Sequence, residues 1–489
     1  MRPSVKFLSD DLIQKITAEA IEILCTLGVK IQNPGVLSLL ADHGAKIDKE
    51  KQHVHFTETL IQKTLDTVSR SFKLYDVFGN ETNDFSGDNV HFAPSSGALG
   101  FLDYTSNKIR RPVTEDYIQY VKVISQLEHL ASQSTAFDCD DVHEKIGDSY
   151  RLFLSLLFGH KPVITGAFVV ESFQVMKDMQ IAIRGSEENL LEKPLTVFSC
   201  CPTSPLKWSD VTSQNLVDCA EFGIPVEFIA MPMAGLIAPV TLVGTLIQHT
   251  AETLSGVVIS QLVRPGTPIL YGGSPAIFDV RYETTPMAAI ETMMIDCAYS
   301  EIGKSLGMPT QAYIGISDAK QLDAQAGMES GLGIALAALS GINNMSSGGM
   351  INFENCISLE KLVLDNEIYG MVFRMLDGIE AKEDFPSLPH FQELFEEKHL
   401  LISDHTRKYL KEEHYFPGPT IDRMNLNRWE NEGSLTVRER AHNEVEKYLI
   451  SYQSTELSNE IKKDLISLME KEGKRVGQNQ LPVDFRIGL

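Results

Sequence analysis

The chain has 489 residues, of which 43 are Lys or Arg and 66 are Asp or Glu, so its formal net charge is -23 at pH 7. This charge repels the phosphate backbone of nucleic acids and the surface of anionic membranes, so neither is an expected partner. Because no run of about 18 apolar residues occurs and no apolar signal stretch opens the chain, we expect a cytoplasmic protein without a membrane span.

The first 88 residues are expected to form a helical cap. Ser9 is a typical residue for the start of a helix, and apolar residues follow it at helical spacing as far as Leu27. A second helix is predicted from Phe56 to Val68. We therefore assign residues 1–88 to an N-terminal helical cap.

From residue 89 onwards, short apolar runs alternate with longer amphipathic segments. The eight strand candidates are residues 89–94, 132–137, 162–168, 195–200, 225–231, 268–272, 310–315 and 342–346. The helix candidates are residues 114–127, 146–158, 172–184, 211–222, 242–263, 287–306, 323–339 and 358–376. Strands separated by helices must pair in parallel, and eight such units favour a closed (β/α)8 barrel over a doubly wound sheet, which is the alternative. We predict an α/β fold with a (β/α)8 TIM barrel over residues 89–379.

Residues 380–489 are expected to form a C-terminal helical appendage. Prolines lie around charged helical turns in the first part of this segment, from Pro386 to Pro419. Two further helices with polar surfaces are predicted over residues 435–451 and 457–473. The three predicted units are thus a cap, a barrel that carries the chemistry, and this appendage.

The reactive groups of a barrel come from the carboxyl ends of its strands, so the candidate site can be assembled from those positions. The predicted rim is acidic and aromatic, and its candidate binding residues are Phe92, Asp138, Phe228, Tyr271, Tyr313, Asp318 and Glu354. Rings and carboxylates together make a cage for a cation, because a quaternary ammonium over a desolvated ring gains up to about 2 kcal/mol. Glu354 follows the last strand, just before a helix that Ser358 is expected to cap.

The cysteines leave a second interpretation open. The chain has seven, an odd number without the spacing of a disulfide framework, which suits free thiols in a reducing compartment. Cys200 and Cys201 end a predicted strand at the rim, where they could bind zinc if histidines or carboxylates lay close by. No His-x-Cys or Cys-x-Cys pair is present, so we expect no metal and keep zinc as the alternative. A nucleotide is not expected, since neither a Walker motif nor a dinucleotide fingerprint occurs.

Several long segments resemble the trimethylamine methyltransferase superfamily of corrinoid-dependent methyltransferases. The segments are Ser317 to Gly327, Gly272 to Arg281, above all Glu360 to Ile368, and the C-terminal stretches at His405, Trp429 and Glu439. The resemblance runs over nearly the whole chain and implies a barrel that moves a methyl group from an amine to the cobalt of a cognate corrinoid protein. It therefore implies no cofactor bound by the chain itself. The apolar helices of a barrel also make a homo-oligomer the expected state.

One departure from the family pattern bears on the substrate. Founding members carry pyrrolysine at the barrel mouth, whereas this chain has only standard residues from Ile316 to Gly327. An uncharged tertiary amine would have to leave as an amide anion unless it were activated first, while a quaternary ammonium leaves as a neutral amine. Because the hard chemistry belongs to the corrinoid, the missing electrophile and the cage both favour a quaternary amine such as glycine betaine, proline betaine or carnitine.

No general base is required for this reaction, so no catalytic residue is assigned. If the substrate carries a carboxylate, Arg281 or Lys320 is the predicted clamp, and the alternative for Arg281 is an ion pair with Asp279 or Glu283. Two other functions stay open at this point. One is a zinc-dependent methyltransferase that uses Cys200 and Cys201, and the other is a non-catalytic subunit that binds a cationic osmolyte.

Overall fold

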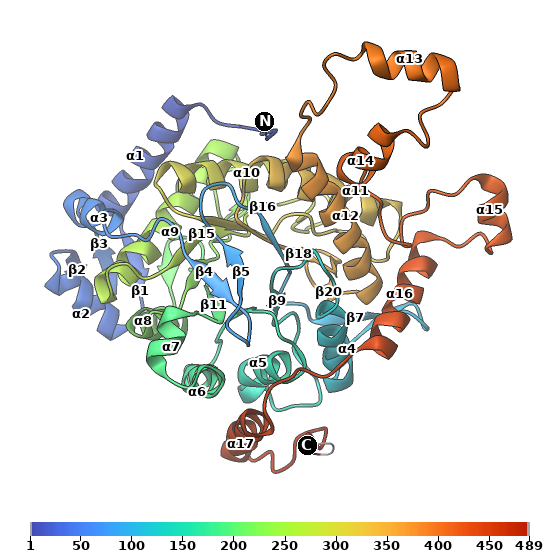
Figure 1. Cartoon of the computed structure of the whole chain (residues 1–489). Helices are drawn as coiled ribbons and strands as arrows, with labels where there is room; N and C mark the ends of the chain where they lie inside the picture. The colour runs from blue at the N-terminus through green and yellow to red at the C-terminus, as the bar shows by residue number, and fades with distance from the viewer. Residues whose placement is uncertain (1, 487–489) are drawn as a thin grey trace.

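The computed structural model describes residues 2–486, and eight parallel strands form its centre (Figure 1). In chain order they are β6 (His91–Pro94), β9 (Gln133–Ser134), β10 (Val163–Thr165), β11 (Thr196–Cys200), β13 (Val226–Phe228), β15 (Ile269–Gly273), β17 (Thr310–Ala312) and β18 (Asn344–Gly348). Neighbours in the sheet follow the chain order, and β18 pairs with β6. The backbone N–H of Ala131 donates to the carbonyl oxygen of Phe92 at 3.0 Å. This hydrogen bond joins the two edge strands of the sheet, β6 and β9. All eight predicted strands are confirmed, and so is the barrel.

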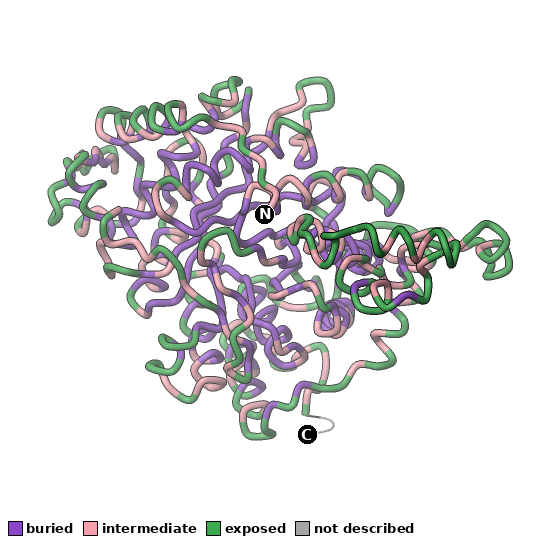
Figure 2. Tube along the Cα trace, turned by 45° about the horizontal axis from the view of Figure 1, so that its top comes forward, coloured by how far each residue is buried: buried purple, intermediate pink, exposed green. Residues whose placement is uncertain are grey.

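Helices cover the outside of the barrel, one or more after each strand. They are α4 (Thr114–Ile124), α5 (Gly147–Phe158), α6 (Ser172–Arg184), α7 (Glu187–Glu192), α8 (Asp210–Phe222), α9 (Leu242–Val263), α10 (Ile290–Ser305), α11 (Ala324–Leu339) and α12 (Leu359–Asp377). The sequence predicted all of them except α7. Figure 1 shows these helices arranged around the strands, and Figure 2 shows the buried segments gathered inside this layer.

A short hairpin closes the end of the barrel at which the strands begin. It consists of β4 (Lys73–Tyr75) and β5 (Glu81–Asp84), and Figure 1 shows it lying across the strands. Side chains of this hairpin region form a separate apolar cluster with inward-facing strand residues. The cluster contains Leu74, Phe85, Ala93, Ile164, Val197 and Leu270. Because this end is filled, a ligand can enter the barrel only from the other end.

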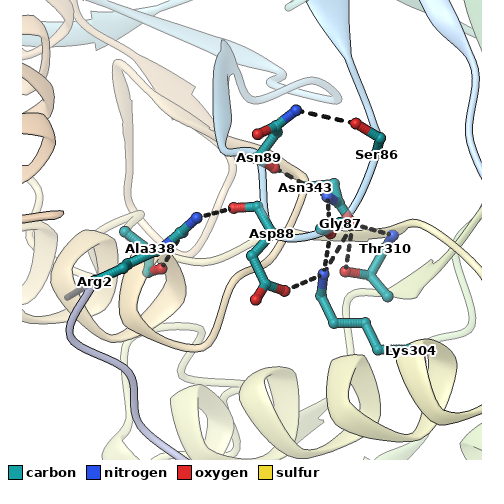
Figure 3. A network of polar contacts seen from close by, with 9 residues as sticks. All are labelled: Arg2, Ser86, Gly87, Asp88, Asn89, Lys304, Thr310, Ala338 and Asn343. Atoms are coloured by element: carbon teal, nitrogen blue, oxygen red, sulfur yellow. Dashed lines mark hydrogen bonds and ion pairs between the residues drawn. The ribbon is translucent and has the colours of Figure 1, made fainter. Parts of the chain in front are cut away.

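A polar network next to the hairpin fixes the join between the first and last strands (Figure 3). The side-chain amide of Asn343, just before β18, donates to the carbonyl oxygens of Gly87 and Asn89, just before β6, at 3.0 and 2.9 Å. Lys304 of α10 donates to the carbonyl oxygen of Gly87 at 2.7 Å and pairs with Asp88 at 2.9 Å. These contacts hold the strand starts in register without contributing to the open end.

The N-terminal extension contains more than the predicted helices. Helices α1 (Asp10–Thr26) and α3 (Glu58–Leu65) match the prediction, and α2 (Pro34–Asp42) was not predicted. Strands β1 (Val29–Ile31), β2 (Lys46–Asp48) and β3 (His53–His55) form a sheet with β12 (Lys207–Trp208). The N-terminal segment therefore contains helices, as predicted, together with a small sheet that was not predicted. Three-residue strands carry too little periodicity to be recognised. One member of this sheet, β12, also lies far along the chain from the other three.

The C-terminal appendage is helical, as predicted. It contains α13 (Leu388–Glu397), α14 (Asp404–Glu413), α15 (Leu426–Asn431), α16 (Val437–Ser451) and α17 (Asn459–Arg475). Helix α16 packs on α12 and α4, and α17 packs on α5 and α6, while α13 has no buried residue. No helix within residues 2–486 is long and apolar enough to cross a membrane. The proposed limits of the three units, at residues 88 and 380, stay a prediction.

Candidate functional site

A cavity of about 650 Å³ opens at the carboxyl ends of the barrel strands. Its walls combine apolar side chains, hydroxyl groups and a few charged groups. The lining includes Ser96, Thr135, Arg151, Thr165, Phe168, Ser199, Cys201, Ile229, Met231, Met233, Ser274, Glu283, Thr284, Thr285, Met287, Tyr313, Phe353 and Glu354. A mostly preformed hollow with few convergent polar groups is typical of a small-molecule site, and this end of a TIM barrel is where such sites lie.

Glu354 reaches the cavity from a loop with an unusual backbone. Three consecutive residues, Asn352, Phe353 and Glu354, have φ values of 56, 57 and 69°, in the left-handed region that side-chain-bearing residues rarely adopt. Each such residue stores of order 1–3 kcal/mol of strain, which persists only where the surroundings enforce it. The backbone N–H of Asn352 donates to the carbonyl oxygen of Ala319 at 2.8 Å. The loop thereby presents both Phe353 and Glu354 to the cavity.

The carboxyl group of Glu354 lies among neutral groups. Ser95 donates to one of its oxygens at 3.2 Å and Ser274 to the other at 3.4 Å. Burial raises the pKa of Glu354 to about 8, although both serine hydrogen bonds lower it. The group is therefore mostly uncharged at neutral pH in the empty cavity. A cation placed beside it would favour the carboxylate and supply the missing charge partner.

A second buried acid, Glu227, faces the barrel interior from the middle of β13. Ser199 donates to its Oε1 at 2.7 Å, while Oε2 has no hydrogen-bond partner within residues 2–486. Burial raises the pKa of Glu227 to about 7. Tyr313 lies near both acids, and its hydroxyl bonds to Ser96 at 2.8 Å. Burial, and then the charges of Glu227 and Glu354, raise the pKa of Tyr313 well above its usual value, so its ring and phenol stay neutral.

The rings that face the cavity are Tyr313, Phe168 and Phe353. Tyr313 is 4% exposed, whereas Phe168 is 65% exposed at the rim. The arrangement therefore offers ring faces, the buried acid Glu354 and hydroxyl groups around one hollow, while Glu227 lies behind the lining residue Ser199. Chemically, it can hold a cation with apolar substituents and keep water away from it.

Three of the predicted ring residues lie elsewhere. Phe92 stacks on Tyr369 of α12 with ring centroids 4.0 Å apart, and Phe228 packs against Trp208. The hydroxyl of Tyr271 donates to Thr250 of α9 at 3.1 Å. All three side chains therefore point outward, from the strands to the helices. Because alternate strand residues face opposite sides, a prediction based on strand ends alone could not choose the inward set. We omit these three from the proposed site.

The predicted acidic neighbours have different surroundings. Glu354 lines the cavity, whereas Asp318 accepts the backbone N–H groups of Met287 and Ala288 at 2.9 and 3.2 Å and so supports the cavity wall from behind. Burial raises the pKa of Asp318 to about 6. Asp138 has a 59% exposed side chain and pairs with Arg151, a cavity residue.

Arg281 lies outside the cavity lining. Its side chain is 76% exposed and pairs with Asp279 at 2.6 Å, and its guanidinium lies 5.4 Å from the ring centroid of Tyr282. This ion pair is the alternative that the sequence left open. Lys320, the other predicted clamp, donates to the carbonyl oxygen of Asp318 at 2.7 Å and lies over the ring of Phe353. It is exposed and is likewise not among the lining side chains.

We expect the substitution Arg281→Ala to change kcat/KM for any quaternary amine by less than about twofold, because an exposed ion pair contributes little. Steady-state methyl transfer by the variant and the unmodified chain checks this result. A tenfold loss restricted to substrates with a carboxylate would restore Arg281 as the clamp.

The cysteine residues do not assemble a metal site. Cys200 is buried on β11 and Cys201 lines the cavity, but residues 2–486 contain no group of three His, Cys, Asp or Glu side chains placed to hold a metal ion. Burial, followed by the neighbouring Cys200, raises the pKa of the Cys201 thiol. The residues present therefore do not fit the zinc alternative.

Sequence reasoning missed Arg151 and Glu227 as site residues. Arg151 lies on α5, whose residues from Gly147 to Leu157 are all buried. Glu227 is the only charged residue of the otherwise apolar run from Val226 to Met231. For Glu227 the available signal was a lone charge inside an apolar strand, since such a charge needs a partner or a function. Arg151 shares its helix with Asp148, so its segment gave no such signal.

Comparisons with known proteins place the chain in one family. The protein-family model described as trimethylamine methyltransferase (MTTB) matches residues 1–477. A glycine betaine methyltransferase of Desulfitobacterium hafniense (strain Y51) is 27% identical over 478 residues, 97% of this chain and 99% of the relative. The trimethylamine methyltransferase MttB of Methanosarcina barkeri (strain Fusaro / DSM 804) is 29% identical over 475 residues, 96% of this chain and 95% of the relative.

A solved structure shares the fold. The crystal structure of the monomethylamine methyltransferase (MtmB) of Methanosarcina barkeri superposes with a TM-score of 0.50 at 13% sequence identity. The match covers 91% of this chain and 89% of that one. At this identity the likeness supports the barrel architecture alone, in agreement with the strand order described above.

Proposed function

We propose that this chain, which belongs to the trimethylamine methyltransferase family and is a methyltransferase, takes its methyl group from a quaternary amine and passes it to a corrinoid carried by a separate protein. The supporting observation is the cavity in which the ring of Tyr313 and the carboxyl of Glu354 lie together at the open end of the barrel. The relative from Desulfitobacterium hafniense, named for glycine betaine, adds support for a quaternary substrate.

The cavity residues would act on the substrate rather than on the acceptor. In the transfer, the carbon–nitrogen bond breaks with its electron pair left on nitrogen, and the amine departs neutral. Reduced corrinoid cobalt supplies the electron pair for the new bond to the methyl carbon. The rings and acids would strip water from the cation, fix its orientation and leave one methyl group facing the open mouth. No side chain has to abstract a proton.

A direct assay tests this proposal. The full chain is mixed with chemically reduced cobalamin and with betaines, carnitine, choline or trimethylamine, and the visible spectrum of the cobalamin reports its methylation. We expect methylation with quaternary amines and none with trimethylamine. Methylation with trimethylamine alone would contradict the proposal. A cognate corrinoid protein, once identified, replaces free cobalamin in the same assay.

The pH dependence of the reaction follows from Glu354. Its pKa of about 8 means that the free enzyme holds the acid in its neutral form below that pH, whereas a bound cation favours the carboxylate. We therefore expect kcat/KM to rise with pH up to about 8 and to level off above it, because kcat/KM reports the ionisation of the free enzyme. A pH profile between about 6 and about 9.5, a range that extends beyond the transition on both sides, checks this. A profile that falls with increasing pH would contradict the role of Glu354.

The expected partners follow from the proposed reaction. The chain would meet a corrinoid protein at the barrel mouth and bind no cofactor of its own. Self-association stays a prediction, and sedimentation velocity of the purified chain would measure it. A purely binding role is not retained, because the chain belongs to a family of methyltransferases.

A further inference from the structure

Arg151 is the one cation whose side chain lines the cavity within residues 2–486. It is 3% exposed and extends from the buried helix α5. A carboxylate on the substrate would need such a group, since a carboxylate taken out of water without a cationic partner is strongly disfavoured. Whether Arg151 is free to pair with a substrate carboxylate therefore decides which substrates the cavity accepts. We call the part of the substrate beyond its ammonium group the tail.

The guanidinium of Arg151 already pairs with two carboxylates, although its Nε makes no hydrogen bond within residues 2–486. Its Nε lies 3.1 Å from Oδ1 of Asp138, and its Nη2 donates to Oδ1 of Asp148 at 2.9 Å. Its Nη1 donates to the carbonyl oxygen of Thr135 at 3.3 Å. Two carboxylates thus surround one positive charge. A substrate carboxylate would be the third.

The side chain of Asp148 cannot rotate away from Arg151 to make room for a substrate carboxylate. Its other oxygen accepts the backbone N–H groups of Phe168 and Val169 at 2.7 and 3.0 Å, and its side chain is 6% exposed. Asp138 is different, because its side chain is 59% exposed and can rotate into water. With both aspartates ionised the group has one excess negative charge, whereas without Asp138 the charge of Arg151 would be just balanced by Asp148.

The rest of the wall is acidic or neutral. Glu283 and Glu354 contribute carboxyl groups to the lining. Apart from Arg151, the other polar side chains of the lining are neutral: the amide of Asn355, the phenol of Tyr313, and the hydroxyls of several serine and threonine residues. Like charges brought together at a desolvated site cost several kcal/mol, whereas hydroxyl groups both donate and accept hydrogen bonds to a neutral polar tail.

We propose that the substrate is a quaternary ammonium compound whose tail ends in a hydroxyl or another neutral polar group, and that Asp138 and Asp148 exclude carboxylated amines by neutralising Arg151. This inference rests on the proposed function and narrows its substrate class. The proposed substrate class therefore excludes glycine betaine, the compound for which the relative in Desulfitobacterium hafniense is named.

Matched pairs of amines test the inference with the full chain. Choline and glycine betaine share the trimethylammonium head and differ in a hydroxyl against a carboxylate. Carnitine and (2-hydroxypropyl)trimethylammonium differ by the carboxylate alone. We expect kcat/KM with reduced cobalamin to be at least about tenfold higher for the uncharged tail in each pair, a factor that corresponds to about 1.4 kcal/mol. An equal or higher value for the carboxylated member would overturn the inference while leaving the methyltransferase function intact.

A variant identifies the residues responsible. Asp138→Asn removes one of the two carboxylates beside Arg151, so we expect the ratio between glycine betaine and choline to shift toward glycine betaine by about tenfold. Asp140→Asn changes an exposed aspartate two positions along the chain and serves as the matched control. An unchanged ratio in Asp138→Asn would show that this carboxylate does not exclude the tail.

Calorimetry supplies a readout that does not depend on turnover. If no amine methylates cobalamin, the proposed function fails, but titration of the chain with choline and glycine betaine still compares the two tails. Tighter binding of choline would support the inference in that case. Tighter binding of glycine betaine, or no binding of either compound, would overturn it.

Discussion

Glu354→Gln should lower kcat/KM for a quaternary amine by about 100-fold. Ser95 and Ser274 donate to the two oxygens of Glu354 at 3.2 and 3.4 Å. The amide oxygen of glutamine can accept from one of these serines and its NH2 group can donate to the hydroxyl oxygen of the other, so the loop conformation should survive. What is lost is the negative charge that the bound cation would otherwise meet. Removing one partner of a desolvated charge pair costs about 2–5 kcal/mol, which brackets the expected loss. Steady-state methylation of reduced cobalamin measures it.

Two comparisons distinguish a charge effect from a general loss of structure. Glu291→Gln changes an exposed glutamate in the first turn of α10 and should leave kcat/KM as it is. The part of the rise of kcat/KM that is centred near pH 8 should disappear in Glu354→Gln, whereas a rise near pH 7 can remain from Glu227. If the variant kept both its activity and its pH profile, the cation site proposed around Glu354 would be wrong.

Lys361→Met should destabilise the folded chain by about 3–5 kcal/mol, since it leaves a buried charge without its partner. Lys361 and Asp365 are both 0% exposed, and their Nζ and Oδ2 atoms lie 2.7 Å apart on adjacent turns of α12. The same Oδ2 accepts the backbone N–H of Gly349 at 2.7 Å. The pair therefore fixes the start of the loop that carries Glu354. The midpoint of thermal unfolding, followed by circular dichroism, should fall by several degrees.

A double variant separates the charge from the packing. Lys361→Met combined with Asp365→Asn has no buried charge, and its amide oxygen can still accept from Gly349, so at least half of the lost stability should return. Lys15→Met removes an exposed lysine paired with Asp11 at the same spacing on α1 and should leave the midpoint nearly unchanged. A double variant less stable than Lys361→Met would contradict this account.

The barrel could be predicted because each of its units is local. A strand such as Thr196–Cys200 reads as a short apolar run, and helix α9 reads as a long apolar helix, whichever neighbours they later meet. Eight such units in alternation leave few topologies, since parallel strands need crossover helices. The sheet at the N-terminus escaped prediction because its strand β1 pairs with Trp208 and Lys207, far away in the chain.

The site was predictable only in part, because successive side chains of a strand point to opposite sides of the barrel wall. Tyr313 and Glu354 were identified from their positions after strands, and both line the cavity. Phe92, Phe228 and Tyr271 were chosen by the same rule but face the helices, because a shift of one residue moves a side chain to the other side of the barrel wall. Arg151 comes from a helix rather than a strand end, so the rule could not reach it.

The sequence by itself determined the fold class, the family and the likeness to methyltransferases, because periodicity and long similar segments survive without coordinates. Only the tertiary structure decided which acids lose their water, which rings face the hollow and which carboxylates surround Arg151. Those properties depend on burial and on distances of about 3 Å between residues far apart in the chain. Spacing along the sequence does not specify them.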